Sequence, residues 1–208
     1  LMICETRNVS RANYALKHGE WREKYPNSGQ IKEMRSSTIG LIGFGAIGRL
    51  VVGLLRPFHC CILINDPYVP KEEIEKYGCK AVSKEELLKE ADIVSLHGRI
   101  GPNDPPIIGK KELSMMHKNS YLINTARAVL VDMDALYEAL KAHDIMGAAI
   151  DVFPKEPLPD NYPLLSLDNC TLTNHRGGDT IDSYNRAPEQ LLEQFQEVLK
   201  TGSTKYMI

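Results

Sequence analysis

Short apolar runs alternate with helix-forming segments from Thr38 onward. The apolar runs predict six strands, at residues 38–43, 60–65, 93–97, 121–124, 148–152 and 170–173. The segments between them have helical spacing and predict helices at residues 46–55, 71–77, 84–90, 110–117 and 133–142. Short apolar strands separated by helices are typical of a parallel sheet that is covered on both faces. With right-handed crossovers, this pattern predicts a doubly wound α/β domain.

Two further helices are expected to flank this domain. Residues 2–18 predict a helix, and the polar, turn-rich residues 26–37 predict a connector. Residues 183–199 place apolar side chains at helical spacing, which predicts packing for Leu191, Leu192, Phe195, Val198 and Leu199. The chain therefore divides into an N-terminal helical arm with its connector (1–37), the α/β domain (38–182), and a C-terminal helix and tail (183–208).

The first predicted strand runs into a glycine-rich turn. Residues 38–49 read TIGLIGFGAIGR, so the apolar run breaks into Gly43-x-Gly45-x-x-Gly48 where a helix is expected to start. In such a turn the first glycine permits the bend, the second lets the backbone approach a pyrophosphate, and the third lets helix and strand pack closely. N–H groups at the helix start, those of Ala46 and Ile47, then face the phosphates. Strand, turn and helix together predict a Rossmann-like dinucleotide-binding domain.

An acidic residue follows the second predicted strand. Asp66 lies eighteen residues after Gly48, at the tip of that strand. A carboxylate at this place can accept both hydroxyls of a ribose and would repel a 2′-phosphate, which favours NAD over NADP as the cofactor. The ordinary alternative for Asp66 and the proline after it is the start of a turn.

Composition limits the partners and the cellular setting. The 208 residues have a net charge of −2 and are 43% hydrophobic, which allows a proper core and indicates neither nucleic acid nor an acidic surface as a partner. No apolar stretch predicts a membrane span, and the first residues do not resemble a signal peptide. The five cysteines lack metal-ligand spacing, so we expect no metal site and a reduced, cytoplasmic setting.

Polar residues that can carry chemistry follow the later strands. His97 ends the third predicted strand, and the sequence Asn-Thr-Ala-Arg (124–127) ends the fourth. The fifth leads into Asp-Val-Phe-Pro-Lys-Glu-Pro (151–157) and the sixth into Thr-Asn-His-Arg-Gly-Gly (173–178). Because ligands of such a sheet lie at the carboxyl ends of its strands, we expect an arginine, a glutamate and a histidine to share one site with the cofactor.

In combination, these motifs resemble those of the D-isomer-specific 2-hydroxyacid dehydrogenases, a family that includes phosphoglycerate, hydroxypyruvate, glycerate and D-lactate dehydrogenases. The glycine turn, Asp-Pro-Tyr, Asn-x-Ala-Arg, Val-Asp, Asp-Val-Phe-x-x-Glu-x-Pro and a late histidine follow the family's order across nearly the whole chain. The resemblance implies that Arg127, Glu156 and His175 are the catalytic set, and that Asp151 contacts the nicotinamide end of NAD. It also implies a second, substrate-binding lobe and a homodimer formed through the N-terminal arm.

The expected cofactor site combines the glycine turn with the strand ends. Its residues are Gly43, Gly45, Ala46, Ile47, Gly48, Asp66, His97, Thr125, Ala126, Arg127, Asp151, His175 and Gly177. We expect His97 to act through burial or a backbone contact rather than in catalysis. Each catalytic candidate keeps an ordinary alternative, namely a surface arginine, a solvated loop acid and a histidine at a strand end.

These residue types suit the reduction of a 2-keto acid, which needs a hydride at the carbonyl carbon and a proton at its oxygen. His175 is a natural proton donor because an unperturbed imidazole titrates near neutrality. A carboxylate beside it, that of Glu156, would favour the charged ring and hold its orientation. The planar, always charged guanidinium of Arg127 suits a substrate carboxylate and would polarise the carbonyl. NAD carries the hydride.

The chain departs from the family pattern in three places. Residues 98–104 (GRIGPND) replace the usual Pro-Leu-Thr-Pro-x-Thr, which puts Gly101 at the place of a pocket-lining threonine and adds the charge of Arg99 near the cleft. Arg99 is compatible with recognition of a second anionic group on the substrate and, equally, with a surface role. Ala128 follows the arginine where glycine is usual, and Asn174 precedes the histidine where proline is usual. The altered loop leaves the substrate class open.

The family places most of a substrate lobe before the glycine turn, whereas this chain begins almost at the linking helix. We therefore expect a cofactor-binding fragment that binds NAD and turns over poorly. An alternative of a different class is a non-catalytic, NAD(H)-sensing interaction protein, like the corepressors that share the scaffold and retain similar Arg, Glu and His residues. Formate dehydrogenase is disfavoured because that relative lacks a glutamate partner for its histidine, and Glu156 is present.

Overall fold

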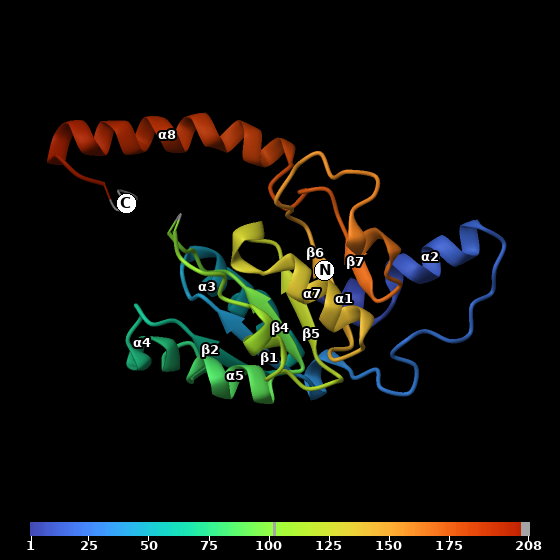
Figure 1. Cartoon of the computed structure of the whole chain (residues 1–208). Coiled ribbons are helices and arrows are strands. Elements are labelled where there is room, and N and C mark those ends of the chain that lie inside the picture. The colour runs from blue at the N-terminus through green and yellow to red at the C-terminus, as the bar shows by residue number, and fades with distance from the viewer. Residues whose placement is uncertain (102, 205–208) are drawn as a thin grey trace. The chain divides into compact units, whose positions relative to one another are not determined.

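The computed structural model describes residues 1–101 and 103–204, and its centre is a parallel sheet of seven strands (Figure 1). The strands are β1 (Thr38–Ile42), β2 (Cys61–Asn65), β3 (Lys80–Ala81), β4 (Ile93–Leu96), β5 (Tyr121–Asn124), β6 (Gly147–Ile150) and β7 (Cys170–Leu172). Their order across the sheet is β3-β2-β1-β4-β5-β6-β7, so strand order reverses between β3 and β4. This is the doubly wound α/β fold that the sequence predicts.

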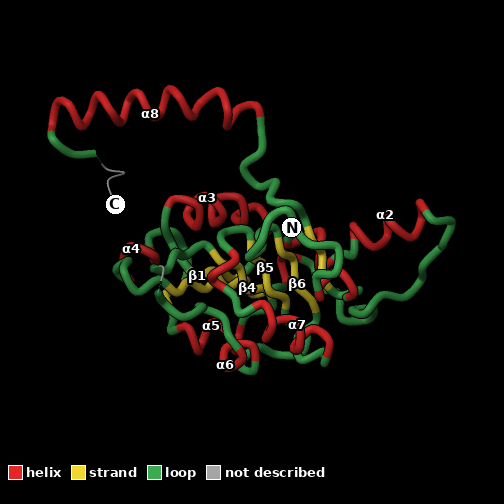
Figure 2. The backbone as a smooth tube through the Cα atoms, turned by 45° about the horizontal axis from the view of Figure 1, so that its top comes forward, coloured by secondary structure: helices red, strands yellow, loops and turns green. Residues whose placement is uncertain are grey.

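Helices connect the strands and cover both faces of the sheet. They are α3 (Ala46–Leu55), α4 (Lys71–Glu75), α5 (Lys84–Glu90), α6 (Lys110–Leu113) and α7 (Met133–Lys141). The helices α1 (Met2–Thr6) and α2 (Val9–Lys17) precede β1, and α8 (Ile181–Thr201) follows β7. Short 3-10 helices lie at Met34–Ser36, Arg56–Phe58, Ala128–Leu130 and Pro163–Ser166. Figure 2 shows α3 on one side of the sheet and α5, α6 and α7 on the other.

Each face of the sheet has its own apolar core. Ile39 and Leu41 of β1 pack in one core with Val52 of α3, whereas Ile42 packs in the other core with Leu88 of α5. Successive residues of a strand point to opposite faces, so a strand buried on both sides reads as a continuous apolar run. This burial explains why the strands could be located from hydrophobicity alone.

The structure corrects several element predictions. The helix expected over residues 2–18 is two helices, because Asn8 adopts left-handed backbone angles (φ 56°) between α1 and α2. The helices α4 and α6 end at Glu75 and Leu113, earlier than predicted. The sequence pattern does not predict the edge strand β3, because two residues are too short to show a period. The remaining strand ends differ by one or two residues, since residues such as Gly43 and His97 already belong to loops.

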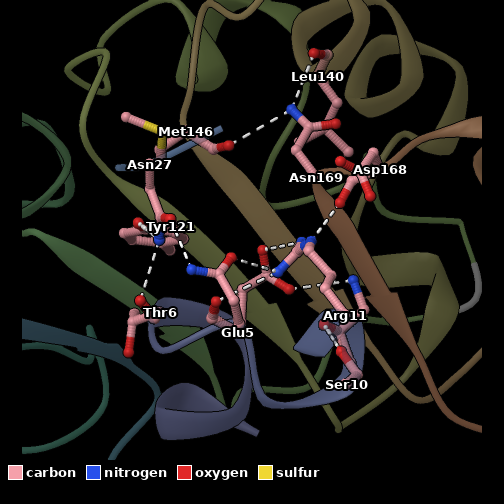
Figure 3. Close-up of polar contacts among 12 residues, drawn as sticks. Glu5, Thr6, Ser10, Arg11, Asn27, Tyr121, Leu140, Met146, Asp168 and Asn169 are labelled. Atoms are coloured by element: carbon pink, nitrogen blue, oxygen red, sulfur yellow. Dashed lines mark hydrogen bonds and ion pairs between the residues drawn. The ribbon is translucent and has the colours of Figure 1, made fainter. Parts of the chain in front are cut away.

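A buried ion pair attaches the N-terminal arm to the sheet (Figure 3). Arg11 Nη2 lies 2.6 Å from Glu5 Oε1, and the two side chains are 8% and 1% exposed. The second carboxylate oxygen of Glu5 accepts a hydrogen bond from the backbone N–H of Thr171 in β7 (3.1 Å). Burial raises the pKa of Glu5, whereas Arg11 and the hydrogen bond from Thr171 lower it. The charged form of the buried Glu5 carboxylate is therefore stabilised mainly by Arg11.

Two buried amide side chains extend this polar network. Asn27 Nδ2 donates to the backbone carbonyl of Thr6 (3.0 Å) and to the hydroxyl of Tyr121 (2.8 Å). Asn169 Nδ2 donates to the backbone carbonyl of Leu140 (3.0 Å). Asn27 thus joins the arm to β5 through a side chain, and Asn169 joins the segment before β7 to α7.

Contacts divide the chain into two compact units, one from Leu1 to Asn174 and one that begins at His175. The second unit consists mainly of α8, which Thr180 caps by accepting a hydrogen bond from the Ser183 N–H (3.1 Å). The apolar residues of α8 do not show the packing expected from their spacing: Leu191, Leu192, Phe195 and Leu199 are 58–74% exposed. Among the described helices, none combines the length and apolar character that crossing a membrane requires.

Candidate functional site

The carboxyl ends of six strands form one row across the sheet. The paired residues, in sheet order, are Asn65, Ile42, Leu96, Asn124, Ile150 and Leu172. The residues that follow them are Asp66, Gly43, His97, Thr125, Asp151 and Thr173. The first five belong to the expected cofactor site, and Thr173 does not. Parallel pairing thus brings these five residues, from distant parts of the sequence, to one edge of the sheet.

The glycine turn after β1 has the geometry that its spacing predicts. Gly43 has φ +101°, and a Cβ on it would lie 2.4 Å from the backbone nitrogen of Gly98, so a side chain does not fit. A Cβ on Gly48 would lie 2.4 Å from the carbonyl oxygen of Gly43, which reflects the close approach of α3 to the turn. A Cβ on Gly45, by contrast, would meet nothing within 4 Å. The space at Gly45 is therefore open to a ligand that must approach the backbone.

Helix α3 begins at this open space. Gly45 is its N-cap residue, Ala46 and Ile47 are its first residues, and no side chain among the described residues caps its amino end. The N–H groups of a first helical turn have no partner within the helix, and the positive end of the helix dipole favours an anion beside them. These backbone donors and the open cradle at Gly45 fit the pyrophosphate of a dinucleotide.

Asp66 links the end of β2 to the glycine turn. Its Oδ2 accepts a hydrogen bond from the Phe44 N–H (2.6 Å), and its Oδ1 accepts one from the Tyr68 N–H (2.9 Å). A carboxylate has about four lone-pair sites, so both oxygens can accept further hydrogen bonds. The capacity to bind ribose hydroxyls therefore lies directly beside the cradle for the phosphates.

Arg49, the cation nearest in sequence to the glycine turn, is engaged elsewhere. Its Nη2 lies 2.6 Å from Glu73 Oε1. Its guanidinium carbon lies 4.5 Å from the ring centre of Phe44 and 5.4 Å from that of Tyr77. These contacts tie α3 to α4 and the segment after it. The turn itself thus presents backbone N–H groups rather than the charge of Arg49.

His97 is a neutral, anchored histidine. Burial lowers the pKa of His97 to about 4, so its imidazole carries no charge near neutral pH. Its Nε2 lies 3.0 Å from Ser95 Oγ, and its backbone N–H donates to the carbonyl of Ile42 (2.7 Å). A ring held in this way is poorly suited to deliver a proton, and its role at the cofactor stays a prediction.

The loop after β5 is shaped by Asn124, a residue that the expected site did not include. Asn124 is fully buried; its Nδ2 donates to the carbonyl of Arg127 (2.9 Å) and its Oδ1 accepts from the Ala126 N–H (3.1 Å). Thr125 and Arg127 are exposed, and Arg127 Nη1 donates to the carbonyl of Ala126 (2.6 Å). An asparagine at a strand end that closes its own loop is a recognisable sequence signal.

Asp151 is held by a second residue outside the expected site, Thr173. Thr173 Oγ1 donates to Asp151 Oδ1 (2.5 Å), and the aspartate is 3% exposed. The Asp151 N–H donates to the carbonyl of Asn124 (3.0 Å), and the Thr173 N–H donates to that of Ile150 (3.0 Å). The partner of Asp151 comes from the neighbouring strand, so only the strand register could reveal it.

The remaining catalytic candidates lie in different units. Glu156 is in the loop after β6, where its Oε1 accepts a hydrogen bond from the Phe153 N–H (2.9 Å). His175 begins the second unit with left-handed backbone angles (φ 57°), and Gly177 follows it there. The pairing of Glu156 with His175 therefore stays a prediction.

Known proteins with similar sequences share this domain. Residues 1–177 match the family model described as "D-isomer specific 2-hydroxyacid dehydrogenase, NAD binding domain". A D-3-phosphoglycerate dehydrogenase from Methanocaldococcus jannaschii is 41% identical over 202 residues, which cover 96% of this chain and 38% of that protein. A glyoxylate reductase from Thermofilum pendens is 36% identical over 203 residues, which cover 96% of this chain and 60% of that protein.

A solved structure leads to the same conclusion. The crystal structure of D-lactate dehydrogenase with NAD+ from Lactobacillus jensenii has a TM-score of 0.83 and 29% identity, and the match covers 100% of this chain and 65% of that one. The chain thus spans 38–65% of the length of these three proteins. From the family match, the relatives and the glycine turn on a doubly wound sheet, we conclude that the chain belongs to the D-isomer specific 2-hydroxyacid dehydrogenase family and contains its NAD-binding domain.

Proposed function

We propose that this chain is the cofactor-binding part of an oxidoreductase that transfers a hydride between NAD(H) and C2 of a 2-hydroxy or 2-keto acid. The observation that carries the proposal is the row of strand ends, which puts the glycine turn, Asp66 and Asp151 along one edge of the sheet. The relatives named as a D-3-phosphoglycerate dehydrogenase and a glyoxylate reductase support this class of reaction.

The chain's own residues divide the work of holding the cofactor, and NAD(H) supplies the hydride chemistry when bound. The first-turn N–H groups of α3 bind the pyrophosphate at the Gly45 cradle. Asp66 accepts the ribose hydroxyls and disfavours a 2′-phosphate, so the chain prefers NADH to NADPH. Asp151, fixed by Thr173, orients the nicotinamide end.

Three side chains are proposed to act on the substrate. The exposed guanidinium of Arg127 donates one hydrogen bond to the carbonyl of Ala126. Its other N–H groups can bind a substrate carboxylate and carbonyl oxygen. His175 exchanges the proton with the oxygen at C2. The proposed role of Glu156 is to favour the charged form of that imidazole and to orient it.

The proposed site is completed by a substrate lobe. Thr125 and Arg127 are exposed at the sheet edge, whereas hydride transfer requires water to be excluded. A second lobe that closes over this edge would exclude water and bind the rest of the substrate. The 208 residues alone are therefore expected to bind NADH but to turn over poorly.

Self-association through the arm is also proposed. Tyr14, Leu16 and Trp21 are 65%, 58% and 82% exposed, which is unusual for a group of large apolar side chains on one short segment. We propose that these side chains pack against the same side chains of a second copy in a homodimer. Light scattering of the purified chain tests this, and a monomer at all concentrations would contradict it.

Replacing Asp66 with alanine is expected to weaken NADH binding by roughly tenfold or more, because hydrogen bonds to a charged group are lost. Asp66→Ala also loses the hydrogen bond from the Phe44 N–H. Asp66→Asn keeps an acceptor for that N–H, so it separates the loss of the charge from the loss of this hydrogen bond. The measurement is fluorescence titration with NADH and NADPH. NADPH binding should improve in both variants.

Asp144→Ala, at an exposed site in the turn before β6, is the matched control and should bind NADH like the unaltered chain. Equal NADH affinity in Asp66→Ala and the unaltered chain would contradict the proposed ribose contact. No NADH binding by the unaltered chain would contradict the cofactor site itself.

Turnover separates the enzyme from its non-catalytic alternative. The assay follows NADH oxidation with glyoxylate, hydroxypyruvate and 3-phosphohydroxypyruvate, for this chain and for a longer form that includes a substrate lobe. We expect the longer form to reduce at least one of them. NADH binding without reduction of any 2-keto acid, together with NADH-dependent peptide binding, would favour the interaction protein. Fast turnover by the 208 residues alone would overturn the need for a second lobe.

A further inference from the structure

The segment after β4 lies against the glycine turn. A Cβ on Gly43 would fall 2.4 Å from the nitrogen of Gly98 and 2.6 Å from the carbonyl carbon of His97. A Cβ on Gly98 would in turn lie 3.7 Å from the carbonyl oxygen of Ile42. Arg99 is the next residue, and consecutive Cα atoms are about 3.8 Å apart. Its backbone therefore leaves the sheet directly beside the cradle for the phosphates.

Arg99 is an uncommitted cation at this place. In the part of the chain that the structure describes, its side chain is exposed and has no hydrogen bond or ion pair. Asp104 of the same loop and Asp66 beside the glycine turn have other partners: Asp104 Oδ2 accepts from the Gly101 N–H (2.7 Å), and Asp66 Oδ2 accepts from the Phe44 N–H (2.6 Å). Arg49 is paired with Glu73. Arg99 thus supplies the positive charge that the glycine turn itself does not offer.

Strand β4, which leads to Arg99, has two neighbours in the sheet. Leu96 pairs with Ile42 on one side and with Asn124 on the other, so β4 lies between the strand of the glycine turn and the strand that leads to Arg127. The backbone of His97 and Gly98 lies against Gly43 of the glycine turn, and a Cβ on Gly98 would lie 3.5 Å from Ile107 and 3.7 Å from the carbonyl oxygen of Ile42. The position of Arg99 therefore favours the cofactor's phosphates over a group on the substrate.

We propose that Arg99 binds the diphosphate of the cofactor and supplies side-chain charge beside the backbone donors of α3. The proposal rests on the binding of NAD(H) to this domain. A guanidinium can bind a phosphate through two parallel hydrogen bonds, and such charge-assisted contacts are stronger than neutral ones. The contact would also make the affinity for the cofactor fall more steeply with ionic strength.

The test compares Arg99→Ala and Arg99→Lys with the unaltered chain, using NADH, ADP and adenosine as probes in calorimetric titrations. Arg99→Ala should weaken NADH and ADP by roughly tenfold or more, because hydrogen bonds to charged groups are lost, and should change adenosine binding less than twofold. Arg99→Lys keeps the charge without the planar fork, so it should recover part of the loss. The dependence of NADH affinity on salt should flatten in Arg99→Ala.

Arg35→Ala is the matched control, since Arg35 is exposed, has no ion pair among the described residues and lies before β1, at the opposite end of that strand. Unchanged NADH and ADP affinity in Arg99→Ala would overturn the proposal while leaving the proposed function intact. The proposal would also be overturned if, in a longer form with a substrate lobe, Arg99→Ala raised only the KM for an anionic 2-keto acid. If the unaltered chain binds neither NADH nor ADP, the proposed function and this proposal both fall.

Discussion

Replacing His175 with asparagine is expected to lower kcat for 2-keto-acid reduction by roughly 10²–10⁴-fold, the contribution of positioned proton transfer. The effect applies to any form of the protein that turns over. Asparagine tolerates the left-handed backbone angles of this position (φ 57°), so the substitution removes the imidazole with little strain. Affinity for NADH should fall much less than kcat, because the proton transfer that is lost acts on the substrate. Steady-state kinetics and NADH titration measure the two quantities.

His143 offers a matched control for this experiment. It is exposed and has nearly the same backbone angle (φ 55°), so His143→Asn tests the loss of a histidine from such a conformation without touching the proposed site. Its kcat should equal that of the unaltered protein. A His175→Asn variant that retains full kcat would contradict the role of His175. Glu156→Gln should lower kcat less than His175→Asn, because it removes the orienting charge and leaves the ring.

Replacing Arg11 with methionine is expected to destabilise the fold by about 3–5 kcal/mol, the cost of leaving a buried charge without its partner. Glu5 is 1% exposed, and with Arg11 gone its carboxylate keeps the hydrogen bond from the N–H of Thr171. A double variant, Arg11→Met with Glu5→Gln, should recover part of the loss because it removes the charge as well. Denaturant unfolding measures the free energy of unfolding of all three.

The control is Arg22→Met, because the Arg22–Asp168 pair is 31% and 53% exposed and exposed ion pairs contribute about 0–1 kcal/mol. A similar loss in Arg11→Met and Arg22→Met would contradict the distinction between buried and exposed pairs. Burial raises the pKa of Glu5 and removal of Arg11 should raise it further, so protonation is favoured in the folded state. The loss in Arg11→Met should therefore be smaller at pH 5 than at pH 8.

Local sequence patterns identified much of the candidate site because its parts are short and self-contained. The conformation of Gly43 and the closeness of Gly48 follow from a turn of six residues, and both have the geometry expected from the spacing. Asn124 and Thr173 were not identified as site residues. Asn124 holds the Arg127 loop, a role that its place at a strand end could have suggested, whereas Thr173 binds Asp151 across two strands that are distant in sequence.

The same difference between local patterns and contacts of distant segments holds for the rest of the chain. The sequence by itself determined the strands buried on both faces, the doubly wound order and the family, because apolar runs and glycine spacing act over a few residues. Only the tertiary structure decided the break between α1 and α2 at Asn8, the pairing of Glu5 with Arg11 against β7, and the position of Gly98 against the glycine turn. Each of these depends on register and burial between segments far apart in the chain, and no local pattern contains that information.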